Sequence, residues 1–418
     1  MFDQITLSNG LRIVGEKLTH VRSCTVGIWV KVGSTNENPN ENGLSHFIEH
    51  LVFKGTEKRS ARDIAEEMDQ VGGQLNAFTS KECTCYYAKV IDEDMPLAVD
   101  ILSDLVSHPT FDEVELNKER GVVLEEISMV EDTPDDLVHE LLSEIQYNGS
   151  LRMPILGTTS LLNKYTQNDV INYWKKHYCL NNMVLAIAGN YDWDTFVNLA
   201  NEAFSDFPNS NCSLYDYPAQ EFISRQTARN KDTEQVHLCM GFPGITSTSD
   251  SQYTMSILNI ALGGGMSSRL FQRIREDLGM AYSVYSYASG YLTSGALTMY
   301  AGIAPHTGER VLSEINDVVN NFYKNGITAD EFLSAKAQLR SGYLLGLESS
   351  GGRMQSLGRG LLLLNRLRDS DQVLAGINAV TIEDVHTLAN QVLSVPPSLA
   401  IVGKNSDTLL EKWKESVI

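Results

Sequence analysis

Residues 166–190 read TQNDVINYWKKHYCLNNMVLAIAGN, and residues 381–405 read TIEDVHTLANQVLSVPPSLAIVGKN. In both segments the apolar residues first recur at helical spacing and then form a short run that ends near a glycine. This pattern predicts an amphipathic helix followed by a buried strand. The pattern returns after about 215 residues, a distance too long for a solenoid repeat, so we infer that the chain is one domain duplicated.

A second pair of similar segments supports the duplication. Residues 111–126, FDEVELNKERGVVLEE, match residues 328–345, TADEFLSAKAQLRSGYLL, in charge placement and helical periodicity. Residues 205–222 lie between the halves, are rich in Ser, Asn and Pro, and lack periodicity, which is typical of a linker. The predicted organisation is an N-terminal domain over residues 1–208, a linker over residues 209–224 and a C-terminal domain over residues 225–418.

The first half alternates between strand and helix patterns. Strand patterning occurs over residues 11–16, 24–33, 72–80 and 83–91. Amphipathic helical patterning occurs over residues 60–72, 95–107 and 112–130, the first of them with Ser60 and Asp63 as a capping pair. Adjacent strands joined by short connections indicate antiparallel pairing. We therefore predict an α+β fold of two homologous domains, each a mainly antiparallel sheet with helices on one face.

The composition limits the classes of partner. The chain has 418 residues, 42% of them hydrophobic and 21% charged, which is ordinary for a soluble globular protein. Its net charge of −20 opposes binding to nucleic acid and to anionic membranes. Residues 1–14 lack the basic and apolar regions of an export signal, so we expect none, and no run of the ~18 apolar residues that a spanning helix needs occurs in the sequence. We expect a soluble, cytoplasmic chain with neither nucleic acid nor membrane as a partner.

The six cysteines are scattered and do not form a disulfide framework. Reduced thiols are therefore expected. Cys83 and Cys85 could form a thiolate metal pair, or they could share one face of a strand as small packing residues.

Residues 43–56, GLSHFIEHLVFKGT, contain the pattern H-x-x-E-H. On a helix, His46 and His50 project from one face, so both imidazoles can converge on one metal ion while Glu49 reaches a water there. The alternative is a solvated helix face. Neighbouring apolar residues such as Phe47 and Leu51 argue against it, because buried His and Glu side chains need partners and a metal provides them.

A catalytic zinc site usually has three protein ligands. The predicted helix over residues 112–130 and its continuation offer Glu119, Glu125, Glu126 and Glu131 as candidates. Glu119 and Glu126 are seven residues apart and share a face, whereas Glu125 points about 100° away. One carboxylate could bind the metal and another could hydrogen-bond a ligand histidine.

Four segments together resemble the M16 metallopeptidases, the inverzincins with H-x-x-E-H. They are GLSHFIEHLVFKGT, NAFTSKECTCYY, ERGVVLEE and SSRLFQRIREDLGMAYSV. The resemblance covers essentially the whole chain and is closest to the short bacterial members akin to the β subunit of mitochondrial processing peptidase. It implies a duplicated α/β sandwich of the M16/LuxS-like metallohydrolase type.

The resemblance also implies roles for residues of the first half. His46, His50 and Glu126 match zinc ligands for one Zn²⁺ per chain, Glu49 matches the general base, and Glu119 matches an acidic residue beside the ligands. Asn76, Ala77 and Phe78 match an edge strand that holds an extended substrate, in agreement with peptide binding by strand addition. From the residues alone, this segment could simply be an edge strand.

The second half has no H-x-x-E-H, and its counterpart of Glu126, near residues 342–345, carries no acid. The resemblance implies instead that Arg275 and Tyr282 face the substrate or the transition state. Alternatively, Arg275 belongs to a surface ion-pair cluster. That cluster would contain Arg269, Arg273, Glu276 and Asp277. The triple glycine at residues 263–265 predicts a tight turn before a helix, because no Gly-Lys-Ser or Gly-Lys-Thr sequence follows it.

These expectations combine into a zinc-dependent endopeptidase that hydrolyses short or unfolded peptides. Glu49 would remove a proton from water and return it to the leaving amine. Zinc, with Tyr282 or Arg275, would stabilise the oxyanion. The resemblance implies a homodimer. The competing hypotheses are a non-catalytic structural subunit of an M16-type assembly and a metal-storage or metal-sensing protein, which would not need Glu49 or a peptide-holding strand.

Overall fold

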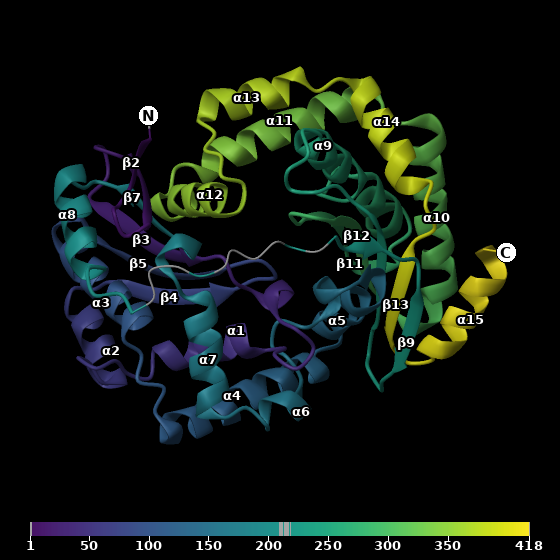
Figure 1. The fold of residues 1–418 in the computed structure, drawn as a ribbon. Coiled ribbons are helices and arrows are strands. Elements are labelled where there is room, and N and C mark those ends of the chain that lie inside the picture. The colour runs from purple at the N-terminus through teal and green to yellow at the C-terminus, as the bar shows by residue number, and fades with distance from the viewer. Residues whose placement is uncertain (1, 209–211, 213–216, 218, 418) are drawn as a thin grey trace. The chain divides into compact units, whose positions relative to one another are not determined.

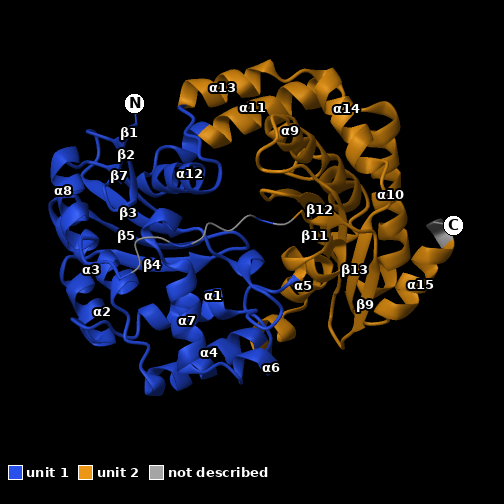
Figure 2. Cartoon of the chain, in the orientation of Figure 1, with its two compact units in different colours: residues 1–127, 153–217, 344–369 blue, residues 128–152, 218–343, 370–418 orange. Residues whose placement is uncertain are grey.

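The computed structural model describes residues 2–208, 212, 217 and 219–417, and the chain forms two compact units (Figures 1 and 2). Unit 1 contains Met1–Ile127, Met153–Tyr217 and Leu344–Asp369. Unit 2 contains Ser128–Arg152, Pro218–Tyr343 and Ser370–Ile418. Each unit therefore includes a segment from the other half of the sequence. A single boundary within the predicted linker does not divide the chain into these units. Half of that linker, residues 209–211, 213–216 and 218, lies outside the described residues.

Unit 1 is built on a six-stranded sheet of order β1-β2-β7-β3-β5-β4. The strands are β1 (Asp3–Thr6), β2 (Arg12–Lys17), β3 (Ser23–Val30), β4 (Gln74–Thr79), β5 (Thr84–Ile91) and β7 (Met183–Gly189). Only the β2–β7 pair is parallel among these strands. The four predicted strands of the first half are confirmed. The antiparallel β3–β5–β4 arrangement places β4 at the end of the sheet.

The first half of the sequence supplies most of the helices of unit 1. They are α1 (Leu44–Val52), α2 (Ala61–Gln70), α3 (Met95–Ser107), α4 (Glu113–Asp132), α6 (Thr159–Leu162), α7 (Gln167–His177) and α8 (Trp193–Ala203). The predicted cap of α2 is present, since the Ser60 hydroxyl accepts a hydrogen bond from the amide of Asp63 and the Asp63 side chain accepts one from the amide of Ser60. Residues of α1, α3 and α7 share one apolar core with the sheet.

The other face of the unit 1 sheet is covered by α12 (Ser350–Leu363), a helix from the second half. It packs on β2, β3 and β7. The Trp29 indole Nε1 donates to Met354 Sδ at 3.3 Å, and the hydroxyls of Thr25 and Ser350 are 2.9 Å apart. Gly358 lies against the indole of Trp29, where an added Cβ would be 2.0 Å from Nε1. This close approach requires glycine.

Unit 2 repeats the strand order of unit 1. Its sheet has the order β11-β12-β10-β13-β9, with strands β9 (Gln226–Asn230), β10 (Val236–Pro243), β11 (Ala281–Gly290), β12 (Gly295–Ile303) and β13 (Ser398–Gly403). The β9–β13 pair is parallel and the others are antiparallel. Read from β9, this is the arrangement β2-β7-β3-β5-β4 of unit 1. The predicted duplication and the predicted α+β fold are confirmed. The prediction of helices on one face of each sheet is wrong for unit 1, because α12 covers the face of its sheet opposite α1, α3 and α7.

Unit 2 also includes a helix from the other half of the sequence, α5 (Pro134–Gln146), so α5 and α12 are exchanged between the two halves. Its other helices are α9 (Gln252–Leu262), a π-helical turn (Phe271–Asp277), α10 (Gly308–Asn325), α11 (Ala329–Gly346), α13 (Ser370–Ala379), α14 (Ile382–Leu393) and α15 (Ser406–Val417). Helix α5 comes from the first half, yet it packs on β10 and β13, with Leu142 in one apolar cluster with Cys239 and Ala400. A short ladder joins β6 (Tyr147–Asn148) to β8 (Glu221–Phe222). Among the described residues, no helix is both long and apolar enough to cross a membrane.

Candidate metal centre

Helices α1 and α4 bring two imidazoles and one carboxylate together in unit 1. The Oε2 atom of Glu126 is 3.7 Å from His46 Nε2 and 3.6 Å from His50 Nε2. In the part of the chain that the structure describes, these three side chains form the one group of three or more His, Cys, Asp or Glu whose candidate ligand atoms all lie within 4.8 Å of one another. The three residues predicted as zinc ligands therefore lie together in the structure.

The donor set of this cluster suits a zinc ion. Atoms bound about 2.0–2.1 Å from a tetrahedral zinc lie roughly 3.4 Å apart, close to the separations from Glu126 to the two imidazoles. Glu126 Oε2 is buried without a hydrogen-bond partner among the described residues. Burial, and then the neighbouring His50, lower the pKa of His46 to about 3, so its imidazole is neutral at physiological pH and keeps a lone pair for a metal.

A second carboxylate on α4 orients one of the imidazoles. Glu119 lies two turns before Glu126 and is buried, and its Oε2 atom is 3.2 Å from His50 Nδ1. Lys54 Nζ lies 2.8 Å from the other oxygen, Oε1. If Nδ1 of His50 donates to Glu119, Nε2 is left as the free acceptor facing Glu126, an arrangement common beside metal sites.

Lys54 was not identified from the sequence, although its position four residues after His50, close to the end of the same helix, was a usable signal. The remaining two candidate acids, Glu125 and Glu131, lie outside the cluster. Glu125 is exposed, and Glu131 pairs with Arg229 at 2.6 Å.

Glu49 lies on α1 between the two histidines and contacts the edge strand. The hydroxyl of Thr79, in β4, donates to Glu49 Oε2 at 2.5 Å. Burial raises the pKa of Glu49, and the nearby Glu126 adds to the rise, whereas the Thr79 hydrogen bond and His50 oppose it. A carboxylate with a raised pKa beside a metal cluster is a candidate for proton transfer. Thr79 was not identified from the sequence, although it directly follows the predicted substrate-holding residues.

The predicted substrate-holding residues Asn76, Ala77 and Phe78 lie in β4, the terminal strand of the described sheet. Beside β4 and α2 there is a cavity of about 630 Å³. Its lining includes Phe53, Ile64, Met68, Leu75, Lys54, Asp69 and Asn76. This lining mixes apolar and polar side chains. A cavity beside a terminal strand can receive a side chain from a peptide added to that strand.

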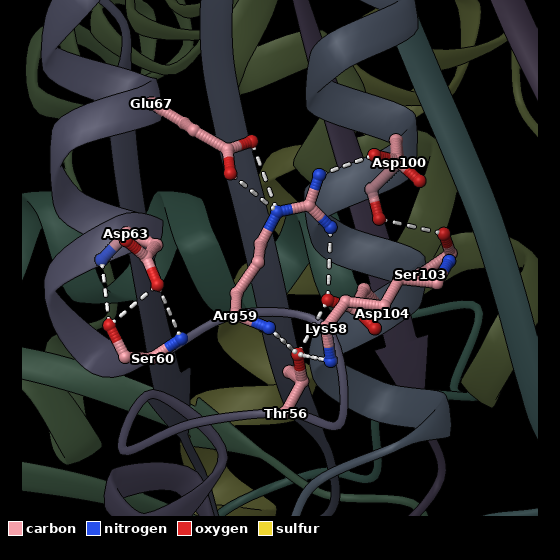
Figure 3. Close-up of polar contacts among 9 residues, drawn as sticks. All are labelled: Thr56, Lys58, Arg59, Ser60, Asp63, Glu67, Asp100, Ser103 and Asp104. Atoms are coloured by element: carbon pink, nitrogen blue, oxygen red, sulfur yellow. Dashed lines mark hydrogen bonds and ion pairs between the residues drawn. The ribbon is translucent and has the colours of Figure 1, made fainter.

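The turn that follows α1 is fixed by a half-buried arginine (Figure 3). Arg59 donates to Asp104 of α3 at 2.9 Å, to Asp100 of α3 at 2.5 Å and to Glu67 of α2 at 3.0 Å. The Thr56 hydroxyl also donates to Asp104, at 2.7 Å. These contacts tie the C-terminal exit of α1 to two neighbouring helices and so restrict the helix that carries both histidines.

Arg275 and Tyr282 lie in unit 2. The Arg275 guanidinium lies 4.8 Å from the ring centroid of Phe271 and 5.7 Å from that of Tyr282, and Tyr282 is 79% exposed. Two neighbours of Arg275 in the predicted ion-pair cluster have acidic partners, with Arg269 bound to Glu331 and Arg273 bound to Glu314. Arg275 therefore packs on aromatic rings, while its neighbours form the surface ion pairs.

The cysteine pair and the triple glycine are both explained by packing. Burial raises the pKa of the Cys83 and Cys85 thiols, which favours protonated packing residues over a thiolate pair. Gly263 ends α9, and an added Cβ there would be 2.6 Å from the Ser286 hydroxyl. The triple glycine thus forms the predicted tight turn.

Family models match both halves of the chain. The model described as Insulinase (Peptidase family M16) matches residues 12–159. The model described as Peptidase M16 inactive domain matches residues 164–339. The second match agrees with the absence of histidine and acid from α9.

Similar proteins are found in several bacteria. The uncharacterized zinc protease YmxG of Bacillus subtilis is 43% identical over 97% of this chain and 99% of its own length. An uncharacterized zinc protease of Streptomyces coelicolor is 42% identical over 99% of this chain and 92% of its own length. These relatives extend the family match across nearly the whole sequence.

Two solved structures share the fold at low sequence identity. A protease from Helicobacter pylori superimposes with a TM-score of 0.91 and 21% identity, covering 96% of this chain and 99% of that one. A peptidase M16 inactive domain from Pseudomonas fluorescens gives a TM-score of 0.90 with 18% identity, covering 97% and 98%. These two structures show the shared fold. The two family matches and the full-length relatives establish that the chain belongs to peptidase family M16.

Proposed function

We propose that this protein is a zinc-dependent endopeptidase that hydrolyses short or unfolded peptides. The observation that carries the proposal is the contact between the metal cluster and the edge strand. Glu49, between His46 and His50, is hydrogen-bonded to Thr79 of β4. A proton-transferring carboxylate is thus held between a candidate metal site and a strand that could bind an extended peptide.

In the proposed reaction, His46, His50 and Glu126 hold one zinc ion per chain. Zinc bound there would supply Lewis-acid chemistry, polarising a carbonyl and acidifying a water toward a pKa of about 7. Glu49 would accept the proton of the water that attacks the peptide carbonyl, hold it at a carboxylate oxygen and deliver it to the leaving amine. Burial raises the pKa of Glu49, which makes its carboxylate a better acceptor for the proton in the first step.

Peptide selection would rest on β4. A substrate added to the free side of this strand forms main-chain hydrogen bonds with the segment of Asn76, Ala77 and Phe78, and one of its side chains enters the cavity lined by Phe53 and Leu75. An extended peptide meets this requirement and a folded domain does not. We further propose that Arg275 and Tyr282 contact the substrate and that the active form is a homodimer, so a purified active species with the mass of one chain would contradict the dimer.

The test is Glu49→Gln, assayed with a quenched-fluorescent peptide library and with zinc content measured in parallel. The variant should keep its zinc and lose about 10²- to 10⁴-fold in kcat, the range that a general base contributes. Glu125→Gln, an exposed acid on α4, is the matched control and should retain full activity. Turnover retained by zinc-loaded Glu49→Gln would refute the assigned role. A zinc-loaded wild-type protein that cleaves nothing would favour the non-catalytic hypothesis.

A further inference from the structure

Glu37 is a buried carboxylate at the N-terminus of α1, outside the metal cluster. It is 3% exposed. Its Oε2 atom accepts hydrogen bonds from the amide of Gly43 at 2.8 Å and from Asn42 Nδ2 at 2.9 Å, and its Oε1 atom accepts one from the amide of Ser45 at 2.8 Å. The N-cap of α1 is Gly43, which has no side chain to cap the helix. Glu37 takes over that task from outside the helix.

We propose that Glu37 is a positioning residue of the zinc site, fixing the first turn of α1 and supplying negative charge beside it. Ser45, whose amide Glu37 holds, directly precedes the candidate ligand His46. Because the two carboxylate oxygens bind amides on either side of Leu44, they restrict both rotation of α1 about its axis and sliding along it. This inference rests on the zinc site of the proposed function.

The charge of Glu37 matters as well as its position. A helix N-terminus carries a partial positive charge, which opposes placing a divalent cation near the first turn. An ionised carboxylate at that end offsets the partial charge. The amides that donate hydrogen bonds to Glu37 are neutral, so they do not cancel its negative charge as an ion-pair partner would.

The surrounding titratable groups leave Glu37 as the group that changes charge near neutral pH. Tyr173 of α7 binds the Ser45 hydroxyl at 2.9 Å, and Tyr165 donates to the carbonyl of Asn42 at 2.7 Å. Burial first, and then Glu37, raise the pKa of both phenols, which therefore stay neutral. Glu41 of the same loop pairs with Lys176 of α7 at 3.3 Å.

Burial raises the pKa of Glu37 to about 7, against the opposing effect of its hydrogen bonds. The carboxylate is therefore mostly ionised at pH 8 and mostly protonated at pH 6. Its contribution to cation binding should be present at the higher pH and largely lost at the lower one.

The experiment compares the zinc affinity of Glu37→Gln with that of wild type at pH 8 and pH 6, by competition with a chromophoric chelator. Residues that orient metal ligands typically contribute 10- to 100-fold, so we expect about 10-fold weaker zinc binding at pH 8 and a difference within about 2-fold at pH 6. Glu41→Gln removes the same charge from the same loop without touching an α1 amide through its side chain. It should match wild type at both pH values.

Equal affinity of Glu37→Gln and wild type at pH 8, or an equal loss at both pH values, would overturn the proposal. Circular dichroism checks that the variant is folded. If Glu37→Gln is not folded, Asn42→Ala is the second variant, because it keeps the carboxylate and both backbone amides that bind it. Asn42→Ala should weaken zinc binding at pH 8 by about 2- to 5-fold, less than the 10- to 100-fold of a full positioning residue. An unchanged zinc affinity of this variant would also overturn the proposal. Failure of wild type itself to bind zinc would refute the proposed function instead.

Discussion

The two units share one strand order but differ in the helices that correspond to the metal cluster. In unit 1, α1 carries His46, Glu49 and His50, and α4 carries acids along two turns of one face. In unit 2, α9 reads QYTMSILNIAL, and the acids of α11 are confined to its first turn. The scaffold therefore forms without a metal cluster. Among the described residues, the cluster occurs in one copy of the duplicated unit.

The difference also changes what each helix contributes to its core. In α9, buried side chains such as Ile257, Leu258 and Leu262 fill the apolar interior of unit 2. Helix α1 also buries apolar residues such as Phe47 and Leu51. In addition, burial lowers the pKa of its His46 and raises that of its Glu49, which shows that the site disfavours their charged forms. Zinc binding would offset this cost of burial in unit 1 alone. It would raise the free energy of unfolding by about 2.7 kcal/mol at a free zinc concentration of 100 times Kd.

The largest expected effect comes from making α4 resemble α11 by Glu126→Ala. Zinc sites formed by proteins bind with roughly 10–16 kcal/mol, so one ligand of three carries about 4 kcal/mol, close to a thousand-fold in affinity. Competition with a chelator measures this loss, which should abolish peptide hydrolysis at low zinc. Glu125→Ala, one residue earlier on α4, should change neither quantity, and comparable zinc binding by both variants would exclude Glu126 as a ligand.

A smaller effect is expected for Lys54→Met, which removes the cation that holds Glu119. Glu119 would then lose the partner on Oε1 and orient His50 less well, lowering zinc affinity by about 10- to 100-fold. Lys58→Met is the control, because Lys58 has the same charge and is exposed. Equal zinc affinities for the two variants would show that Lys54 has no positioning role.

Much of this site could be predicted from the sequence, because a helix converts spacing into direction. The offset between His46 and His50 and the seven-residue offset between Glu119 and Glu126 give the right faces of α1 and α4. Side chains from separate elements could not be predicted in this way. Thr79 and Glu37 contact α1 through the sheet edge and a loop, and no periodicity relates them to it.

The same limit applies to the fold. Strands, the cap formed by Ser60 and Asp63, and the duplication follow from local patterns. The exchange of α5 and α12 does not follow from them. An amphipathic pattern shows that a helix has a face to bury, but it does not show which of two similar sheets will cover that face.

A shift in pH dependence, without loss of zinc, is expected for Thr79→Val. The Thr79 hydroxyl favours the ionised form of Glu49, so its removal should raise the pKa of Glu49 further. Because the base must be ionised to act, the acidic limb of the kcat/KM profile should move to higher pH, with the plateau at high pH retained. Thr79→Ser keeps the hydroxyl and should leave the limb in place; no shift in the valine variant would contradict this contact.

The smallest effect on activity is expected for Gly358→Ala, which tests the exchanged helix. In a free helix this change would stabilise by about 1 kcal/mol. The new Cβ would instead clash with the Trp29 indole, so we expect a net destabilisation of about 1–3 kcal/mol by thermal or urea unfolding. Gly351 of α12 has open space around it, and Gly351→Ala should not destabilise. A stabilised Gly358→Ala would contradict the packing of α12 on β3.

The most direct measurement is the zinc stoichiometry of the wild-type chain and of Glu126→Ala, determined by native mass spectrometry at low zinc. A single cluster in unit 1, with unit 2 lacking its counterpart, predicts one zinc per wild-type chain and none per chain of the variant. Two zinc ions per wild-type chain, or one that remains in Glu126→Ala, would contradict it.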